Sequence, residues 1–221
     1  MVEQIKLKTS DGVEIAGDYY GIGDAAAPAV VLTHMMPSNR ESWRDFAFAL
    51  NRVGFQCLAI DLRGHGESEG GPDGYREFGD EGHMAGIKDV ESAADFFVSN
   101  GVLPEKISLA GASIGANLSL QFQSEHPETK ASVLLSPGLD YYGINTEAAA
   151  KKIREDQAVF LCAGGENDEY STETARKLFD ILKSKNKRIK IFQNAGHGTT
   201  IFSEEPGLMD EIIGWLKQIY A

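Results

Sequence analysis

Short, almost unbroken apolar runs recur along the chain, separated by stretches long enough for a helix. A strand of a parallel sheet is covered by helices on both faces, so it appears as a continuous apolar run rather than an alternating one. The pattern therefore predicts strands buried on both faces. These runs occupy residues 29–33, 56–60, 107–110, 132–135, 158–162 and 189–192.

The first 20 residues follow a different pattern. Residues 4–20 alternate polar and apolar positions around Asp11-Gly12. An Asp-Gly pair between alternating runs is typical of a hairpin turn in which both turn residues take positive φ. This predicts an antiparallel hairpin at the edge of the sheet.

Apolar residues spaced three or four apart predict helices between the runs. The first helix follows a capping-box spacing at residues 38–41 and is closed by Gly54. The expected helices cover residues 43–50, 87–97, 114–125, 172–185 and 208–219.

A hairpin followed by alternating strands and helices predicts the α/β class. We expect a single domain over residues 1–221, with a mostly parallel central sheet and helices on both faces. The longest irregular stretches, residues 61–80 and 138–156, leave little room for a lid domain.

The net charge of −12 repels phosphate backbones and anionic lipids, which argues against nucleic acid or membrane surfaces as partners. A basic cluster at residues 183–190 is interpreted as cations near a helix end and in a solvated turn.

Cys57 and Cys162 lie in apolar runs and are expected to be reduced and buried. The sequence shows no leader and no apolar segment of membrane-spanning length, so we expect a cytoplasmic protein. We expect it to be a monomer or a homodimer.

The sharpest chemical signal is Gly111-Ala112-Ser113-Ile114-Gly115, between a predicted strand and a predicted helix. A nucleophile elbow is a tight strand-to-helix turn that holds its serine in a strained conformation and tolerates only small neighbours. The turn also places the serine at a helix N-terminus, where developing anions are stabilised. Ser113 is therefore the candidate nucleophile.

A serine hydroxyl needs a base, and the base needs an orienting acid. His197 lies in a glycine-containing loop between the last strand and the last helix, where such a base is expected. The acid should follow an intervening strand, and Asp168 is the preferred candidate with Glu166 as its competitor. The order serine, acid, histidine is the order that this type of fold requires.

These motifs resemble the α/β-hydrolase superfamily over essentially the whole chain, close to compact esterases and to the dienelactone-hydrolase-like and serine-aminopeptidase-like groups. The segment from Asp61 to Ser68 resembles the D-x-R-G-x-G-x-S loop of that superfamily, which is mainly structural there, so His65 is expected to be a loop residue. Dienelactone hydrolases usually carry a cysteine nucleophile, and dehalogenases and epoxide hydrolases an aspartate. Ser113 therefore favours ester hydrolysis.

The oxyanion hole is expected to use the backbone N–H groups of Ile114 and, by register, Met36. The second donor belongs to the loop after the predicted strand at residues 29–33. In the superfamily this loop usually begins His-Gly, but here Met35 follows His34. His34 is expected to orient the loop through hydrogen bonds. Met35 and Met36 are equally compatible with lining an acyl pocket and with filling space in the core.

The predicted reaction is hydrolysis of small to medium carboxylic esters through an acyl-enzyme, with a small-molecule substrate and no cofactor. No spacing typical of a metal site occurs, and His83 and His126 are given no role. The alternatives left open are thioesterase, amidase or carbon–carbon bond hydrolase chemistry on the same triad, and a non-catalytic ligand-binding protein.

Overall fold

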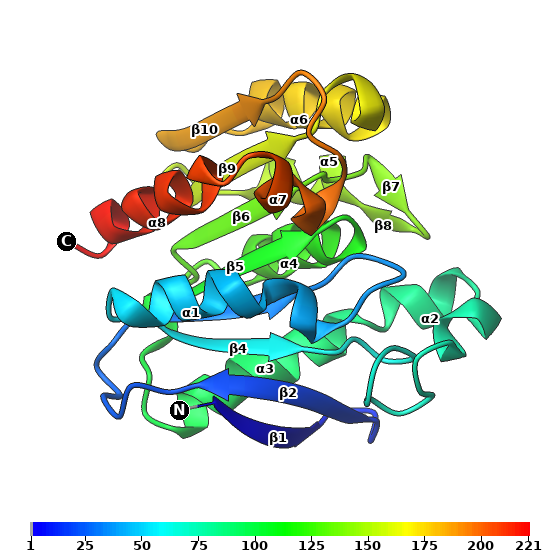
Figure 1. Cartoon of the computed structure of the whole chain (residues 1–221), viewed down its shortest axis with the longest axis vertical. Helices are drawn as coiled ribbons and strands as arrows, with labels where there is room; N and C mark the ends of the chain where they lie inside the picture. The colour runs from blue at the N-terminus through cyan, green and yellow to red at the C-terminus, as the bar shows by residue number, and fades with distance from the viewer. Residues whose placement is uncertain (1) are drawn as a thin grey trace.

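An eight-stranded sheet forms the centre of the computed structural model, which describes residues 2–221 (Figure 1). The strand order is β1-β2-β4-β3-β5-β6-β9-β10; β1 and β2 run antiparallel to their neighbours and the other six strands are parallel. The bounds are β1 Val2–Lys8, β2 Glu14–Tyr20, β3 Ala29–Thr33, β4 Gln56–Ile60, β5 Ile107–Ala112, β6 Ala131–Leu135, β9 Ala158–Ala163 and β10 Asn186–Ile191.

Helices cover both faces of this sheet. Figure 1 shows α1 and α8 in front of the sheet and α3 and α4 behind it. One apolar cluster fills the interface under α1 and α8, and two others lie on the opposite face, one under α3 and α4 and one under α4, α5 and α6. A small hairpin, β7 (Asp140–Tyr141) with β8 (Ile144–Asn145), lies outside the main sheet. The helices are α1 Arg44–Arg52, α2 Asp80–Met84, α3 Ile87–Ser99, α4 Ile114–Glu125, α5 Thr146–Lys152, α6 Glu169–Ile181, α7 Ile201–Glu204 and α8 Gly207–Ile219.

The predicted fold class is confirmed: a mostly parallel sheet with an antiparallel N-terminal hairpin and helices on both faces. Strands β3, β4, β5, β6 and β9 are buried at every position. Burial on both faces explains why each appeared in the sequence as an unbroken apolar run.

The last strand was predicted wrongly as buried on both faces. Strand β10 begins earlier than expected and is half-buried to exposed throughout, because it pairs only with β9 and forms the edge of the sheet. The cations Lys187, Arg188 and Lys190, predicted to lie at a helix end and turn, lie on this strand. Charged side chains on an edge strand hinder pairing with a second chain.

Three further predictions, of a helix boundary, a turn conformation and a helix cap, also need correction. Helix α6 covers residues 169–181 rather than 172–185, because a 3-10 turn leads directly into it from the preceding loop. In the hairpin turn only Gly12 has positive φ, of 88°. The cap before α1 is Asn39, which accepts from the Glu41 N–H at the start of a 3-10 turn, rather than a capping box from Ser38.

Helix α4 packs unusually close to strand β3 at its first turn. The Thr33 hydroxyl donates to the Gly115 carbonyl oxygen at 3.0 Å. A Cβ at Gly115 would lie 2.7 Å from the His34 carbonyl oxygen and closer still to that of Thr33. Only glycine fits there, so this position fixes how near the helix comes to the sheet.

None of the helices in the described part of the chain combines the length and apolarity that a bilayer crossing requires.

We predict that Gly115→Ala destabilises the fold by about 2 kcal/mol or more, because backbone atoms of β3 cannot move away from the new methyl group. Gly214→Ala in α8 is the matched control, since a Cβ there meets no atom within 4 Å and alanine favours a helix by up to about 1 kcal/mol. Urea unfolding of the two variants measures both effects. Equal stability of the two variants would contradict the close contact.

Candidate active site

Ser113 lies at the sharp turn from β5 into α4. Its backbone has φ 53° and ψ −119°, a combination that a non-glycine residue adopts only when its surroundings enforce it. The Ser113 N–H donates to the Leu135 carbonyl at 2.8 Å, which ties the turn to β6. A Cβ at Gly111 would lie 2.5 Å from the Ser119 hydroxyl, so the small residues of the motif let strand and helix meet.

The structure pairs His197 with Asp168. His197 Nδ1 lies 2.8 Å from Asp168 Oδ1. The Asp168 side chain is only 5 % exposed, whereas that of His197 is 38 % exposed. Glu166, the competing acid, is exposed in the 3-10 turn Glu166–Asp168. An acid behind the imidazole fixes its tautomer and leaves Nε2 free to accept a proton.

Further donors hold the second oxygen of the Asp168 carboxylate. The Ser136 hydroxyl donates to Oδ2 at 2.6 Å and the Gly164 N–H donates to it at 3.3 Å. Burial alone would raise the pKa of Asp168, but the hydrogen bonds from His197 and Ser136 outweigh it and lower the pKa. The carboxylate is therefore kept ionised beside the imidazole.

The histidine loop lies directly against the serine turn. A Cβ at Gly198 would lie 3.3 Å from the Ala112 Cβ and 2.5 Å from the Met35 sulfur. The loop is tied to the acid loop by the Gly196 N–H, which donates to Asn167 Oδ1 at 3.0 Å. Within residues 2–221 no hydrogen bond joins Ser113 to His197 directly; such bonds often tighten only when substrate binds.

The two predicted oxyanion donors come from neighbouring segments, since the start of α4 lies against the end of β3. Ile114 begins α4, and Met36 lies in the loop after β3. Among the described residues, neither backbone N–H donates to a protein acceptor. Free N–H groups at a helix N-terminus and in an adjacent loop suit a developing alkoxide.

The two methionines of this loop point to opposite sides of the sheet. Met35 packs against the cluster under α1 and α8, and it also contacts Gly198 of the histidine loop. Met36 packs against the cluster under α3 and α4. Met35, which replaces the usual glycine, thus spaces the oxyanion loop from the histidine loop.

His34 makes two hydrogen bonds through its ring, one of them within the same loop. Because the Leu62 N–H donates to Nε2 at 3.0 Å, the ring proton is on Nδ1, which donates to the Met35 carbonyl at 2.9 Å. Burial, with a smaller contribution from His65, lowers the pKa of His34 to about 3. The ring is therefore neutral at physiological pH.

The segment from Asp61 to Ser68 is held by buried ion pairs and hydrogen bonds. Asp61 accepts from the Arg40 backbone and guanidinium and from the Glu67 N–H. Arg63 pairs with Asp89 and Asp11. His65 is a buried loop residue that stacks on Tyr75 with ring centres 4.3 Å apart.

Tyr141 on β7 approaches the candidate nucleophile. Its hydroxyl lies 3.3 Å from the Ser171 hydroxyl. Burial raises the pKa of Tyr141, although the hydroxyls of Ser171 and Ser113 act in the opposite direction. Tyr141 is thus a neutral phenol beside Ser113.

The cysteines are buried free thiols on β4 and β9, and burial raises the pKa of both Cys57 and Cys162. No group of three or more potential metal-ligating side chains occurs among residues 2–221.

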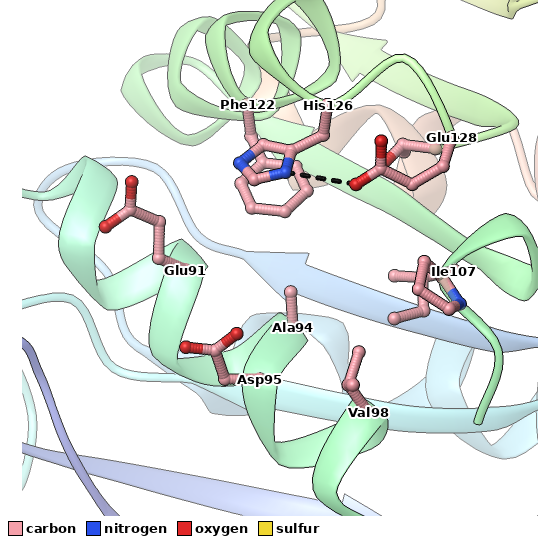
Figure 2. Close-up of a pocket in the computed structure, with 10 residues that line it drawn as sticks. Glu91, Ala94, Asp95, Val98, Ile107, Phe122, His126 and Glu128 are labelled. Carbon is pink, nitrogen blue, oxygen red and sulfur yellow. Dashed lines mark hydrogen bonds and ion pairs between the residues drawn. The ribbon is translucent and has the colours of Figure 1, made fainter. Parts of the chain in front are cut away.

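A separate cavity of about 310 Å³ opens between α3 and α4 (Figure 2). Its walls include Ala94, Val98 and Ile107, and His126 stacks on Phe122 at its edge. Ile107 begins β5 whereas Ser113 follows its end. The cavity therefore lies at the amino ends of the parallel strands, about 20 Å from Ser113. It contains none of the predicted site residues.

Comparison with known sequences identifies the family. Residues 24–153 match the sequence profile described as serine aminopeptidase, S33. The chain belongs to this family of α/β-hydrolases. The match includes the Ser113 turn and ends before Asp168 and His197. An uncharacterized protein of Mycobacterium tuberculosis is 23% identical over 97% of this chain and 79% of its own length.

Solved structures of hydrolases share the fold. The Pyrococcus furiosus esterase Pf2001 superposes with a TM-score of 0.80 at 21% identity, over 100% of this chain and 92% of that one. A dienelactone hydrolase from Anabaena variabilis gives 0.75 at 21% identity, over 100% and 96% of the two chains. The arrangement of elements described above is thus that of a hydrolase fold.

Three neighbours of the site had no signal of their own in the sequence: Ser136, Asn167 and Tyr141. Ser136 directly follows the predicted strand at 132–135. Its place at the same sheet edge as Ser113 was the one available indication, since carboxyl ends of parallel strands converge on sites.

We predict that stability falls as the pH drops from 6.5 to 5, partly because of His34. The folded-state pKa of His34 lies below the unfolded value of about 6.5, so the unfolded chain binds more protons in this window and stability rises with pH there. Chemical unfolding at several pH values measures the slope. His34→Gln, which retains an acceptor for Leu62, should make the slope shallower by up to one proton. An unchanged slope would mean that the ring is not buried in its neutral form.

Proposed function

We propose that this hydrolase is a serine carboxylesterase that cleaves small to medium acyl esters. The observation that carries the proposal is the 2.8 Å contact between His197 and the buried carboxylate of Asp168. The histidine loop packs against Ala112, in the turn that holds the strained Ser113 at a helix N-terminus. An oriented imidazole beside a serine at the carboxyl edge of the sheet is the arrangement that activates a hydroxyl for attack.

In the proposed mechanism, His197 Nε2 removes the Ser113 proton as Oγ attacks the ester carbonyl carbon. The N–H groups of Met36 and Ile114 stabilise the tetrahedral oxyanion, and Asp168 stabilises the imidazolium. His197 then protonates the departing alkoxide, which leaves as the alcohol. Water attacks the acyl-enzyme by the same route and releases the acid and free Ser113.

We predict that Ser113→Ala lowers kcat for 4-nitrophenyl butyrate by about 10³-fold or more, because no other group can form the acyl-enzyme. A fluorophosphonate probe should label Ser113 in the unmodified protein, with the adduct located by peptide mass spectrometry. Full activity of Ser113→Ala would disprove the role of this serine.

The choice of acid is tested in the same assay. Asp168→Asn should lower kcat by about 10²- to 10⁴-fold, because the amide favours the wrong imidazole tautomer. Glu166→Gln, two residues away and exposed, is the matched control and should change kcat by less than about twofold. If the fluorophosphonate probe does not label the folded protein at all, the serine is not activated and ligand binding without catalysis becomes the better explanation.

Assays of thioesters and amides alongside the esters distinguish esterase from thioesterase and amidase activity.

The charge of the loops around the site favours an uncharged substrate. The loops after the parallel strands, residues 34–43, 61–86, 136–145, 164–168 and 192–200, contain no lysine and three arginines, Arg40, Arg63 and Arg76. Arg40 is paired with Asp18, Asp61 and Glu67. Arg63 is paired with Asp11 and Asp89, and Arg76 with Asp73. Among the described residues these loops thus offer a carboxylate-bearing substrate no free cation, while their many acidic side chains repel it.

We predict that kcat/KM for 4-nitrophenyl butyrate exceeds that for the anionic 4-nitrophenyl hemisuccinate by about tenfold or more at low ionic strength. Because repulsion between exposed charges is screened by salt, the ratio should shrink as NaCl is raised to about 0.5 M. Equal rates, or faster cleavage of the anion, would contradict an electrostatic preference. A ratio that does not respond to salt would point to shape instead.

A further inference from the structure

Ser136 occupies the end of β6 with a backbone conformation that needs an explanation. Its φ is 51°, which costs a non-glycine residue about 1–3 kcal/mol, and its side chain is fully buried. The Ser136 N–H donates to the Cys162 carbonyl of β9 at 2.7 Å. The strand end is thus held so that the hydroxyl points to the acid loop rather than along the strand.

The hydroxyl makes two hydrogen bonds whose directions are fixed by its chemistry. Its single proton goes to Asp168 Oδ2 at 2.6 Å, since a carboxylate can only accept. One of its lone pairs accepts the Gly198 N–H at 2.8 Å. Ser136 therefore links the carboxylate of the acid to the backbone of the residue that follows His197.

These bonds close a ring around His197. From the imidazole Nδ1 the ring runs to Asp168 Oδ1, across the carboxylate to Oδ2, through the Ser136 hydroxyl to the Gly198 N–H, and back along the chain to His197. The ring ties the imidazole to its own backbone. A histidine held at both ends keeps few of its rotamers, so its base nitrogen stays in one place.

We infer that Ser136 is a positioning residue for the catalytic histidine, acting through the carboxylate of Asp168. This inference rests on the proposed triad and extends it by a fourth member. Without the hydroxyl, Oδ2 loses its shortest bond and, among the described residues, keeps the 3.3 Å bond from the Gly164 N–H, while the Ser171 hydroxyl still helps to stabilise the carboxylate. The buried N–H of Gly198 loses its acceptor. The carboxylate would then be held less firmly against the imidazole.

The test compares Ser136→Ala with Ser136→Gly. Both remove the hydroxyl, but glycine adopts a φ of 51° without strain, so it keeps the strand end intact. Both variants should lower kcat for 4-nitrophenyl butyrate by about 10- to 100-fold, the range for a hydrogen bond to a charged group, with KM changed less than about threefold. Ser132→Ala is the matched control: it is a buried serine of the same strand whose hydroxyl donates to Gln123 instead.

Two further measurements separate positioning from a merely structural role. In an Asp168→Asn background, Ser136→Gly should have almost no additional effect on kcat, because its action passes through the carboxylate. The second measurement uses a Ser113→Ala background, which needs no turnover. There the downfield proton resonance of the His197 Nδ1–H should be visible while Ser136 is present, and it should be lost to solvent exchange when Ser136→Gly is added.

Several outcomes would overturn the inference. Unchanged kcat and an unchanged resonance in Ser136→Gly would show that the hydroxyl does not position His197. Recovery in Ser136→Gly but not in Ser136→Ala would assign the effect to backbone strain. An additive effect in the Asp168→Asn background would place Ser136 outside the triad. Failure of the proposed esterase function appears separately, as absence of ester turnover in the unmodified protein with the resonance still present.

Discussion

The carboxylate of Asp168 joins the three loops on which the site depends. One oxygen orients His197, and the other is held by Ser136 at the end of β6 and by Gly164 at the end of β9. A buried carboxylate is stable only when donors replace its water, so these loops must converge on it. Their convergence requires glycines: a Cβ at Gly164 would overlap the Gly196 carbonyl. The glycines where the acid and histidine loops meet thus follow from the need to satisfy one charge.

Burial on both faces made most of the fold predictable. Strands β3 to β6 and β9 have no polar face, so their apolar runs had a single interpretation. The pattern failed at β10, where Ile189 and Ile191 alternate with cations because the strand has one neighbour instead of two. Nothing local to those residues reveals how many neighbours a strand has. The start of α6 was missed for a similar reason, since the acid loop Glu166–Asp168 winds straight into it.

The candidate site was predictable where its chemistry constrains the neighbours of a residue. Ser113 and His197 are flanked by small residues because backbones approach closely there, and glycines leave a visible pattern. The acid was ambiguous, because Glu166 and Asp168 are two residues apart in one 3-10 turn and only the turn decides which one faces the imidazole. Ser136 looked like any serine before a proline. Its role depends on a partner 32 residues away, and such a pairing exists only after the strands are assembled.

The rigid and variable parts of the active-site edge have different origins. Ser113 directly follows β5, and Asp168 and His197 lie in short loops that follow β9 and β10; the sheet holds the ends of these strands in register. The rim is built instead from two insertions, residues 61–86 and 138–152, which contact each other where Tyr142 packs on His83 at 4.1 Å between ring centres and where Gly143 faces Met84. Among the described residues, neither insertion hydrogen-bonds to Asp168 or His197. Tyr141, which lies beside Ser113, belongs to the second insertion. Changes elsewhere in these insertions could therefore alter which acyl group fits without changing the partners of Asp168 and His197, so the same strand framework is compatible with many substrates.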